Sequence, residues 1–206
     1  KTWDPKKVIY TTISPYPFLV TNYLSSELKL AIKTELETGN YHLIHTECFY
    51  LMPNIPKTNI PIILVDQTIE YAVYQHFVES IAGWKQIIKP FLWIDVFKLK
   101  FWEVFYWKNT HTVAAVSKDD KKLMSKMAKR QDIRLVPNGV AQRYFNPKKN
   151  VFKTKHPSIL FGISNMKWMQ NREGAELLIT NLWPKIKQKI PQAKLYVIGR
   201  NAPQTF

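Results

Sequence analysis

One stretch near the end of the chain restricts the possible folds more than any other. The apolar run Ile159–Phe161 closes in a loop rich in Gly, Ser and Asn. A helical segment follows, and a second apolar run, Leu195–Ile198, closes in Gly199 and Arg200. Two apolar strands joined by a helix predict a parallel β-α-β unit. Because carboxyl ends of parallel strands share one edge of a sheet, both loops are expected to face one ligand-binding crevice.

The preceding part of the chain alternates strand and helix patterns in the same way, which predicts an α/β fold with parallel sheets. Ser25 and Ser117 are suited to begin helices, and Gly39 is suited to end one. Residues 69–108 are helical by pattern, with an interruption expected at Pro90. The expected strands are residues 8–13, Tyr41–His45, Pro61–Val65, Thr112–Val116 and Arg134–Val136.

The pattern is lost between residues 140 and 157, where polar and basic residues surround Pro147. This composition indicates a connection between domains, and we place the boundary near residue 150. Residues 1–150 are expected to form one domain and residues 151–206 the start of another. Two strands and one helix cannot bury a core, so the second domain is expected to be truncated.

The charge of the chain favours anionic partners. The 30 Lys and Arg residues exceed the 15 Asp and Glu residues, giving a net charge of +15. Nucleic acid, an acidic membrane surface and phosphorylated ligands are all compatible with this excess. Basic residues interleaved with aromatic ones on one face would indicate a nucleic-acid binder, and the sequence lacks that pattern. Nucleic acid is therefore not an expected partner.

The single cysteine, Cys48, excludes a disulfide framework and a Cys-x-x-Cys metal site. A cytoplasmic location is expected. The most apolar stretch, residues 91–108, contains Asp95, Lys98, Lys100 and Glu103, so it does not predict a membrane-spanning helix. Any contact with an anionic membrane would therefore be peripheral, on the inner face of the cell membrane.

Several short motifs in order resemble the family 4 (group 1) retaining glycosyltransferases of GT-B fold. The motifs are Tyr41–His45, Pro61–Leu64, Ala114–Asp120, Pro137–Val140 with Phe145 and Pro147, Gly162 with Trp168–Asn171, and Val197–Arg200. The resemblance implies two Rossmann-like domains that face a cleft. It implies transfer of a sugar from a nucleotide-diphosphate sugar to a hydroxyl of a glycan or lipid-linked acceptor, in polysaccharide biosynthesis. It implies neither a cofactor nor a catalytic metal.

The chain also departs from that family. The family's paired glutamates, which bind the donor, would follow Phe206, and its first strand and Gly-rich turn would precede Tyr41. The chain is therefore expected to be a fragment that is incomplete for activity. A non-catalytic GT-B-like binding module and a GT-B epimerase or phosphorylase remain open as alternatives.

The candidate donor site lies in the second domain. Gly162, Ser164 and Asn165 are expected to end its first strand, and the helix that begins near Asn171 or Arg172 would direct its amino end at a pyrophosphate. Lys167 and Arg172 would stabilise the leaving diphosphate. Gly199 would allow a ligand close to the backbone, and Arg200 would contact phosphate or base. The alternative is that the glycines only form turns, that Asn171 caps the helix and that the cations are solvated.

The candidate catalytic residues are His45 and Glu47, just after the short expected strand at Tyr41–His45, at the carboxyl edge of the first sheet. Either side chain could orient an acceptor hydroxyl or take its proton. Gln67 and Glu70, which follow the next strand, could act in the same way. A lone histidine at a strand end also has a common structural role, and that interpretation remains open.

The aromatic stretch 91–107 permits two interpretations. Apolar residues surround nearly the whole helical circumference, which favours a helix buried against the sheet. The alternative is a helix at a membrane interface, with Lys98 and Lys100 reaching the headgroups.

Overall fold

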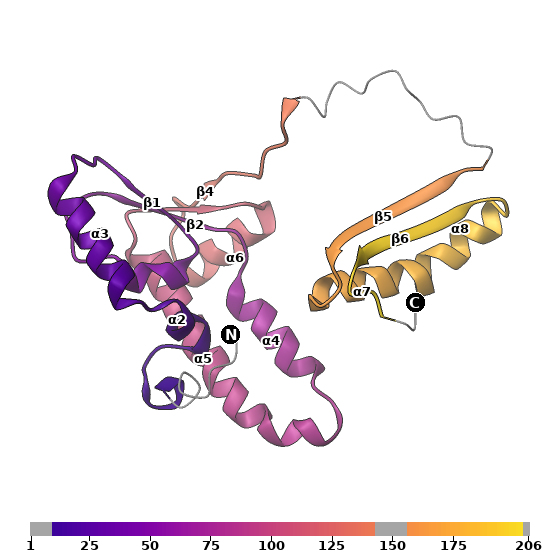
Figure 1. Ribbon diagram of the computed structural model, residues 1–206, viewed down its shortest axis with the longest axis horizontal. Coiled ribbons are helices and arrows are strands. Elements are labelled where there is room, and N and C mark those ends of the chain that lie inside the picture. Colours follow the sequence, from indigo (N-terminus) through magenta and orange to yellow (C-terminus); the bar gives the residue numbers. More distant parts are fainter. Residues whose placement is uncertain (1–9, 143–155, 204–206) are drawn as a thin grey trace. The chain divides into compact units, whose positions relative to one another are not determined.

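The computed structural model describes residues 10–142 and 156–203, and the chain divides into two compact units, Lys1–Gly139 and Val140–Phe206. Each unit pairs a parallel sheet with helices, so the α/β prediction is confirmed (Figure 1). The proposed boundary at residue 150 lies outside the described residues and stays a prediction.

The first unit is built on four parallel strands in the order β1-β2-β3-β4. Leu64 is paired with Val113, and Asp66 with Ala115. The strands are β1 (Ile44–Glu47), β2 (Ile62–Asp66), β3 (Thr112–Ala115) and β4 (Arg134–Leu135). All four were expected, although β1 begins later than the predicted Tyr41 and extends to Glu47.

The helices of the first unit begin and end largely where local signals place them. Ser25 and Ser117 accept hydrogen bonds from Leu28 N and Asp120 N, and Gly39 ends a helix. The elements are α2 (Phe18–Tyr23), α3 (Ser26–Thr38), the 3₁₀ helix η1 (Phe49–Asn54), α4 (Glu70–Ser80), the 3₁₀ helix η2 (Gly83–Ile88), α5 (Lys89–Asn109) and α6 (Lys118–Ala128).

Two local predictions were wrong. Residues 10–13 form a helical turn and not a strand, while residues 8 and 9 lie outside the described part. The helical turn lets Thr11 Oγ1 share a buried hydrogen bond of 2.8 Å with Thr21 Oγ1, so tertiary contacts override β-propensity. Pro90 does not interrupt a helix but lies in the first turn of α5, where its missing N–H costs nothing. The interruption falls instead at the extended residues Ile81 and Ala82, just before Gly83, whose φ is +66°.

The core of the first unit lies between the sheet and helices α5 and α6. Leu64, Val113 and Ala115 on one face of the sheet pack in one cluster with Leu99 and Trp107 of α5 and Met124 of α6. Figure 1 shows α4, α5 and α6 together below the strands. The favoured prediction that residues 91–107 are buried is therefore confirmed for one side of the helix, the side that carries Val96, Leu99, Glu103 and Trp107.

Two carboxylates lie inside this core. Asp66, at the end of β2, accepts a hydrogen bond from Phe49 N at 2.8 Å and one from Trp107 Nε1 at 2.5 Å. Glu103 of α5 accepts hydrogen bonds from Glu70 N and Tyr71 N at 2.8 and 3.0 Å. The first carboxylate ties β2 to η1 and α5, and the second caps the amino end of α4.

The second unit contains two parallel strands, β5 (Ser158–Asn165) and β6 (Lys194–Arg200). The helical connection is α7 (Met169–Leu177), the π-helical turn η4 (Leu178–Leu182) and α8 (Trp183–Lys189). One side of the sheet is covered, whereas Leu160, Tyr196 and Ile198 on the other side are exposed. Parallel sheets normally have both faces covered, so this face is unpartnered within the described residues.

We predict that Trp107→Phe destabilises the first unit by about 2 kcal/mol, because it leaves a buried carboxylate oxygen of Asp66 without its indole donor. Urea unfolding followed by circular dichroism measures the change. Trp84→Phe is the matched control, since Trp84 is 82% exposed and its replacement should change the free energy of unfolding by less than about 0.5 kcal/mol. Equal stability of the two variants would contradict the structural role of the indole N–H.

Candidate functional site

The ends of β5 and β6 meet around Asn165. Its Oδ1 accepts hydrogen bonds from Lys167 N at 3.0 Å and from Asn201 Nδ2 at 2.9 Å. Its backbone oxygen accepts a 2.8 Å hydrogen bond from Asn171 Nδ2. A single residue therefore holds together the end of β5, the loop after it, the first turn of α7 and the turn after β6.

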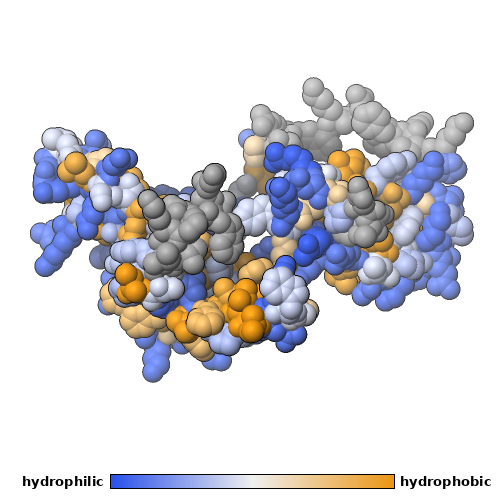
Figure 2. All heavy atoms as spheres, turned by 60° about the horizontal axis from the view of Figure 1, so that its bottom comes forward, coloured by the Kyte–Doolittle hydropathy of each residue, from blue (hydrophilic) through white to orange (hydrophobic). Residues whose placement is uncertain are grey.

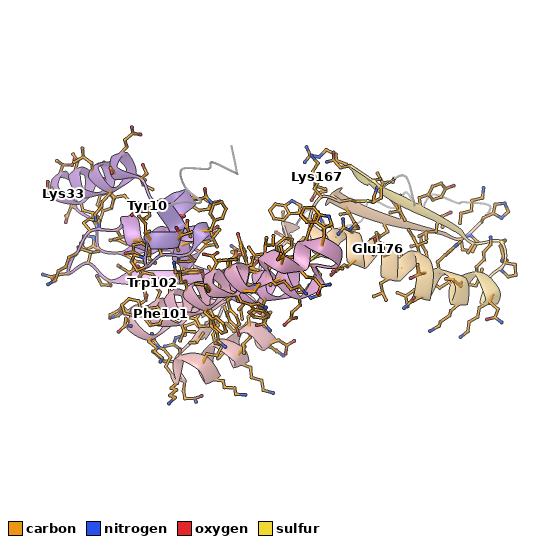
Figure 3. All side chains as sticks on the ribbon, turned by 90° about the horizontal axis from the view of Figure 1, so that it is seen from below. Tyr10, Lys33, Phe101, Trp102, Lys167 and Glu176 are labelled. Atoms are coloured by element: carbon orange, nitrogen blue, oxygen red, sulfur yellow. The ribbon has the colours of Figure 1, made fainter. Side chains whose placement is uncertain are left out.

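Three predicted cations lie on the segments that Asn165 connects. Lys167 is exposed, and Arg172 lies beside Glu176 with Nε 3.9 Å from Oε1. Arg200 Nε donates to the carbonyl oxygen of Ser164 at 3.3 Å. Figure 3 labels Lys167 in the second unit, in the loop between β5 and α7. The cations and the amino end of a helix together suit an anionic group such as a phosphate.

The other predicted donor-site residues lie in α7 and β5. The helix begins at Met169, earlier than predicted, so Asn171 belongs to its first turn and is not its N-cap. The N-cap residue of α7, Trp168, makes no side-chain cap hydrogen bond. Gly162 lies inside β5, paired with Ile198, and not in the loop. Ser164 lies at an irregularity of the strand between Ile163 and Asn165.

Gly199 is the glycine that the site requires sterically. A Cβ at this position would lie 2.7 Å from the carbonyl oxygen of Ile163 and 3.2 Å from Met166 Cε. A Cβ at Gly162 would meet nothing within 4 Å. Gly199 therefore lets β6 approach the irregular end of β5, which is a structural role, and its predicted approach to a ligand stays a prediction.

In the first unit, β1 and β2 bring the predicted catalytic residues together. Glu47 Oε2 accepts a 3.0 Å hydrogen bond from Gln67 Nε2, and Glu47 Oε1 lies 4.0 Å from His45 Nε2. The side chains of His45 and Glu47 are both more than half exposed. His45 lies inside β1, paired with Ile63, and not after the strand as predicted, whereas Glu47 is the last residue of β1. With Gln67 they form an open polar edge that a ligand can reach.

Behind this edge lies a group of acids with raised pKa values. Burial raises the pKa of Asp66 to about 6, although its bonds from Trp107 and Phe49 lower it. Burial, and secondarily the charge of Asp66, raises the pKa of Glu70 to about 7. Burial likewise raises the pKa of Glu103. A half-buried carboxyl that titrates near neutral pH, such as Glu70, is suited to accept a proton.

Sequence reasoning found Glu70 but not Asp66 or Glu103. The burial of Asp66 could have been predicted, because an acid directly after the buried run Pro61–Val65 must find hydrogen-bond donors at the sheet edge. Glu103 carried none, since its partners lie on another helix far away in the sequence.

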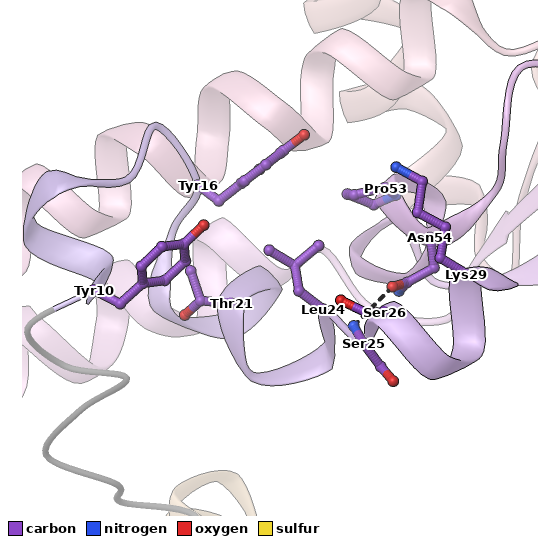
Figure 4. Close-up of a pocket in the computed structure, with 9 residues that line it drawn as sticks. All are labelled: Tyr10, Tyr16, Thr21, Leu24, Ser25, Ser26, Lys29, Pro53 and Asn54. Carbon is purple, nitrogen blue, oxygen red and sulfur yellow. Dashed lines mark hydrogen bonds between the residues drawn. The ribbon is translucent and has the colours of Figure 1, made fainter.

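A pocket of about 510 Å³ was also not predicted. Its walls carry two phenol rings, the Ser26 hydroxyl and the Lys29 ammonium group, which suit a hydroxylated ligand. The Asn54 amide and the Thr21 hydroxyl are already hydrogen-bonded within the protein. Figure 4 shows the two tyrosines on one side and Pro53, Lys29 and Asn54 on the other. The lining residues are Tyr10, Tyr16, Thr21, Leu24, Ser25, Ser26, Lys29, Pro53 and Asn54.

Comparison with known proteins does not identify a family. No family model matches the sequence, and no curated protein matches it. Among residues 10–142 and 156–203, no group of three or more His, Cys, Asp or Glu side chains could hold a metal ion. The site is therefore interpreted from its own geometry and from the motifs of the sequence.

We predict that Gly199→Ala destabilises the second unit by about 1–3 kcal/mol, because the added methyl overlaps the Ile163 carbonyl. Gly162→Ala is the matched control, since its methyl enters open space and should be neutral or slightly stabilising. Hydrogen exchange of the β5 and β6 amides measures both effects. A neutral Gly199→Ala variant would show that the strand ends can separate without cost.

The raised acid pKa values predict that stability falls with rising pH. The folded pKa values of Asp66 and Glu70, about 6 and 7, exceed their usual 3.8 and 4.5. Their contribution is therefore complete below about pH 4 and is lost as pH rises through about 6 to 7. We expect Glu70→Gln to reduce the fall in Tm between pH 5 and pH 8, measured by circular dichroism. The exposed Glu37→Gln is the control, and a variant that follows the wild-type curve would contradict the assignment.

Proposed function

We propose that this chain binds a nucleotide-diphosphate sugar and an acceptor as part of a retaining, GT-B-like glycosyltransferase. The observation that supports this most directly is the Asn165 network. It connects the ends of two parallel strands and the first turn of a helix, and Lys167, Arg172 and Arg200 lie on the connected segments. In α/β proteins such an edge is the usual location of a phosphate-containing ligand.

The proposed role of this edge is to bind and stabilise a diphosphate. Breaking the bond between the sugar and the nucleotide leaves negative charge on the diphosphate oxygens. Cations and helix N–H groups that are already in place stabilise that charge without reorganisation. Lys167 and Arg172 would supply the charge, and backbone N–H groups in the first turn of α7 would act as further donors.

The proposed role of the first unit is to bind the acceptor. Glu47 and His45 would orient an acceptor hydroxyl at the open edge, with Gln67 holding the Glu47 carboxylate in place. Glu70, with its pKa near 7, would be able to receive the proton that the hydroxyl loses. The pocket of Figure 4 provides hydroxyl and phenol groups for further sugar residues of a glycan acceptor.

The proposal uses both units as the two Rossmann-like domains of a GT-B enzyme, with no metal in the reaction. A cytoplasmic location agrees with a lone Cys48 thiol and with a soluble nucleotide-sugar donor. The chemistry proposed for the strand ends needs only the described cations, the helix terminus and the carboxylates.

The test is calorimetric titration of the whole chain with UDP, GDP and ADP in the presence of EDTA. We expect at least one nucleotide to bind with a Kd below about 1 mM. Lys167→Ala should weaken this binding about tenfold, because it removes a charge-assisted contact to phosphate. Lys185→Ala is the matched control, an exposed lysine on α8 whose removal changes the net charge equally.

Two results would overturn the donor site. One is the failure of all three nucleotides to bind although circular dichroism shows a folded chain. The other is an equal loss of affinity in Lys167→Ala and Lys185→Ala, which would indicate non-specific attraction to the net positive charge.

A further inference from the structure

The first unit exposes a continuous row of large apolar side chains, which we call the apolar stripe. Trp84, Ile87 and Phe91 are 82%, 77% and 72% exposed, and Phe97 and Phe101 are 63% and 62% exposed. A soluble surface rarely gathers so many exposed aromatic residues without a partner. The stripe consists of Trp84, Ile87, Ile88, Phe91, Ile94, Phe97, Phe101 and Phe105.

Helix periodicity explains why the stripe is continuous. Ile94, Phe97, Phe101 and Phe105 are three or four residues apart, which places them on one side of α5. The opposite side of α5 carries Val96, Leu99, Glu103 and Trp107 and is buried. Figure 2 shows hydrophobic surface gathered over the end of the α4–α5 hairpin, and Figure 3 labels Phe101 on α5.

The charges on this segment are of one sign at the surface. Between residues 81 and 110 the acids are Asp95 and Glu103, and both are occupied by the protein itself. Asp95 Oδ1 accepts a 2.8 Å hydrogen bond from Phe18 N, and Glu103 is fully buried as the cap of α4. The exposed cations Lys85 and Lys108 lie near the two ends of the stripe.

We propose that the apolar stripe docks the protein on the surface of an anionic lipid bilayer. Aromatic and aliphatic side chains would enter the boundary between headgroups and acyl chains, and the lysines would contact lipid phosphates. A second copy of the chain fits less well, because stacking two stripes would bring lysines of like charge together. The 21-residue helix α5 would lie in the plane of the interface.

The proposed contact does not require a helix that crosses the membrane. Over the stretches that the structure describes, none of the helices combines the length and the apolar character needed to cross a bilayer. The proposal therefore concerns contact from one side and does not depend on the proposed donor site.

The test is co-sedimentation of the whole chain with two kinds of vesicles, phosphatidylcholine alone and phosphatidylcholine with 30% phosphatidylglycerol. We expect binding to the anionic vesicles that decreases with salt. Phe97→Ser and Phe101→Ser should each lower the partition coefficient about tenfold, because each removes an aromatic side chain that inserts. Ile13→Ser is the matched control, since Ile13 is an apolar residue outside the stripe with 81% exposure.

The variants change only exposed side chains, and circular dichroism checks that each is folded. Loss of binding in both phenylalanine variants but not in Ile13→Ser supports the proposal. Equal binding of all variants would overturn it, because the contact would then be purely electrostatic. Absence of binding to the anionic vesicles would also overturn the proposal. Self-association in sedimentation velocity that the phenylalanine variants abolish would overturn it in favour of a second copy of the chain.

Discussion

Two carboxylates that lie inside the first unit determine how its helices meet the sheet. Asp66 joins the end of β2 to η1 and α5, and Glu103 joins α5 to the amino end of α4. Burying a carboxyl is costly unless donors surround it, so each acid specifies the position of its backbone or indole partners. The same two acids lie next to Glu70 and Gln67 at the sheet edge. Asp66, which holds the fold together, therefore also helps to raise the pKa of Glu70 in the proposed acceptor site.

Most of the secondary structure was predictable because its signals are local. Ser25, Ser117 and Gly39 mark helix ends by their own hydrogen-bonding and backbone properties. Buried parallel strands can be recognised in the sequence as apolar runs. The errors arose where a distant contact decides. The turn at residues 10–13 is helical, and two distant contacts accompany it. Thr11 and Thr21 share a hydrogen bond, and Lys98 donates hydrogen bonds to the carbonyl oxygens of Thr11 and Ser14. The φ of +72° at Cys48 has no sequence signal either, since glycine usually marks such positions.

The candidate site was predictable to the extent that it depends on strand ends. Parallel strands bring their carboxyl ends to one edge, and this explains why Asn165, Gly199 and Arg200 were found together from the sequence. The pairing of Glu47 with Gln67 follows in the same way from adjacent strands. The pocket around Tyr10 and Asn54 could not be predicted, because its walls come from helices whose packing no periodicity specifies. The sequence also could not predict which side of α5 faces solvent, since apolar residues surround nearly the whole helix.

The strand order has a consequence for where a crevice can form. The chain crosses the first sheet in a single direction, β1-β2-β3-β4, and right-handed crossovers in one direction place their helices on one face. The packing of β2 agrees: Leu64 and Asp66 on one face are buried, whereas Ile63 and Val65 on the other face are only half-buried. A crevice at a doubly wound sheet opens where the winding reverses. Among the described strands the direction does not reverse. A further strand paired with the free side of β1 would reverse it, and the resulting crevice would lie beside His45 and Glu47.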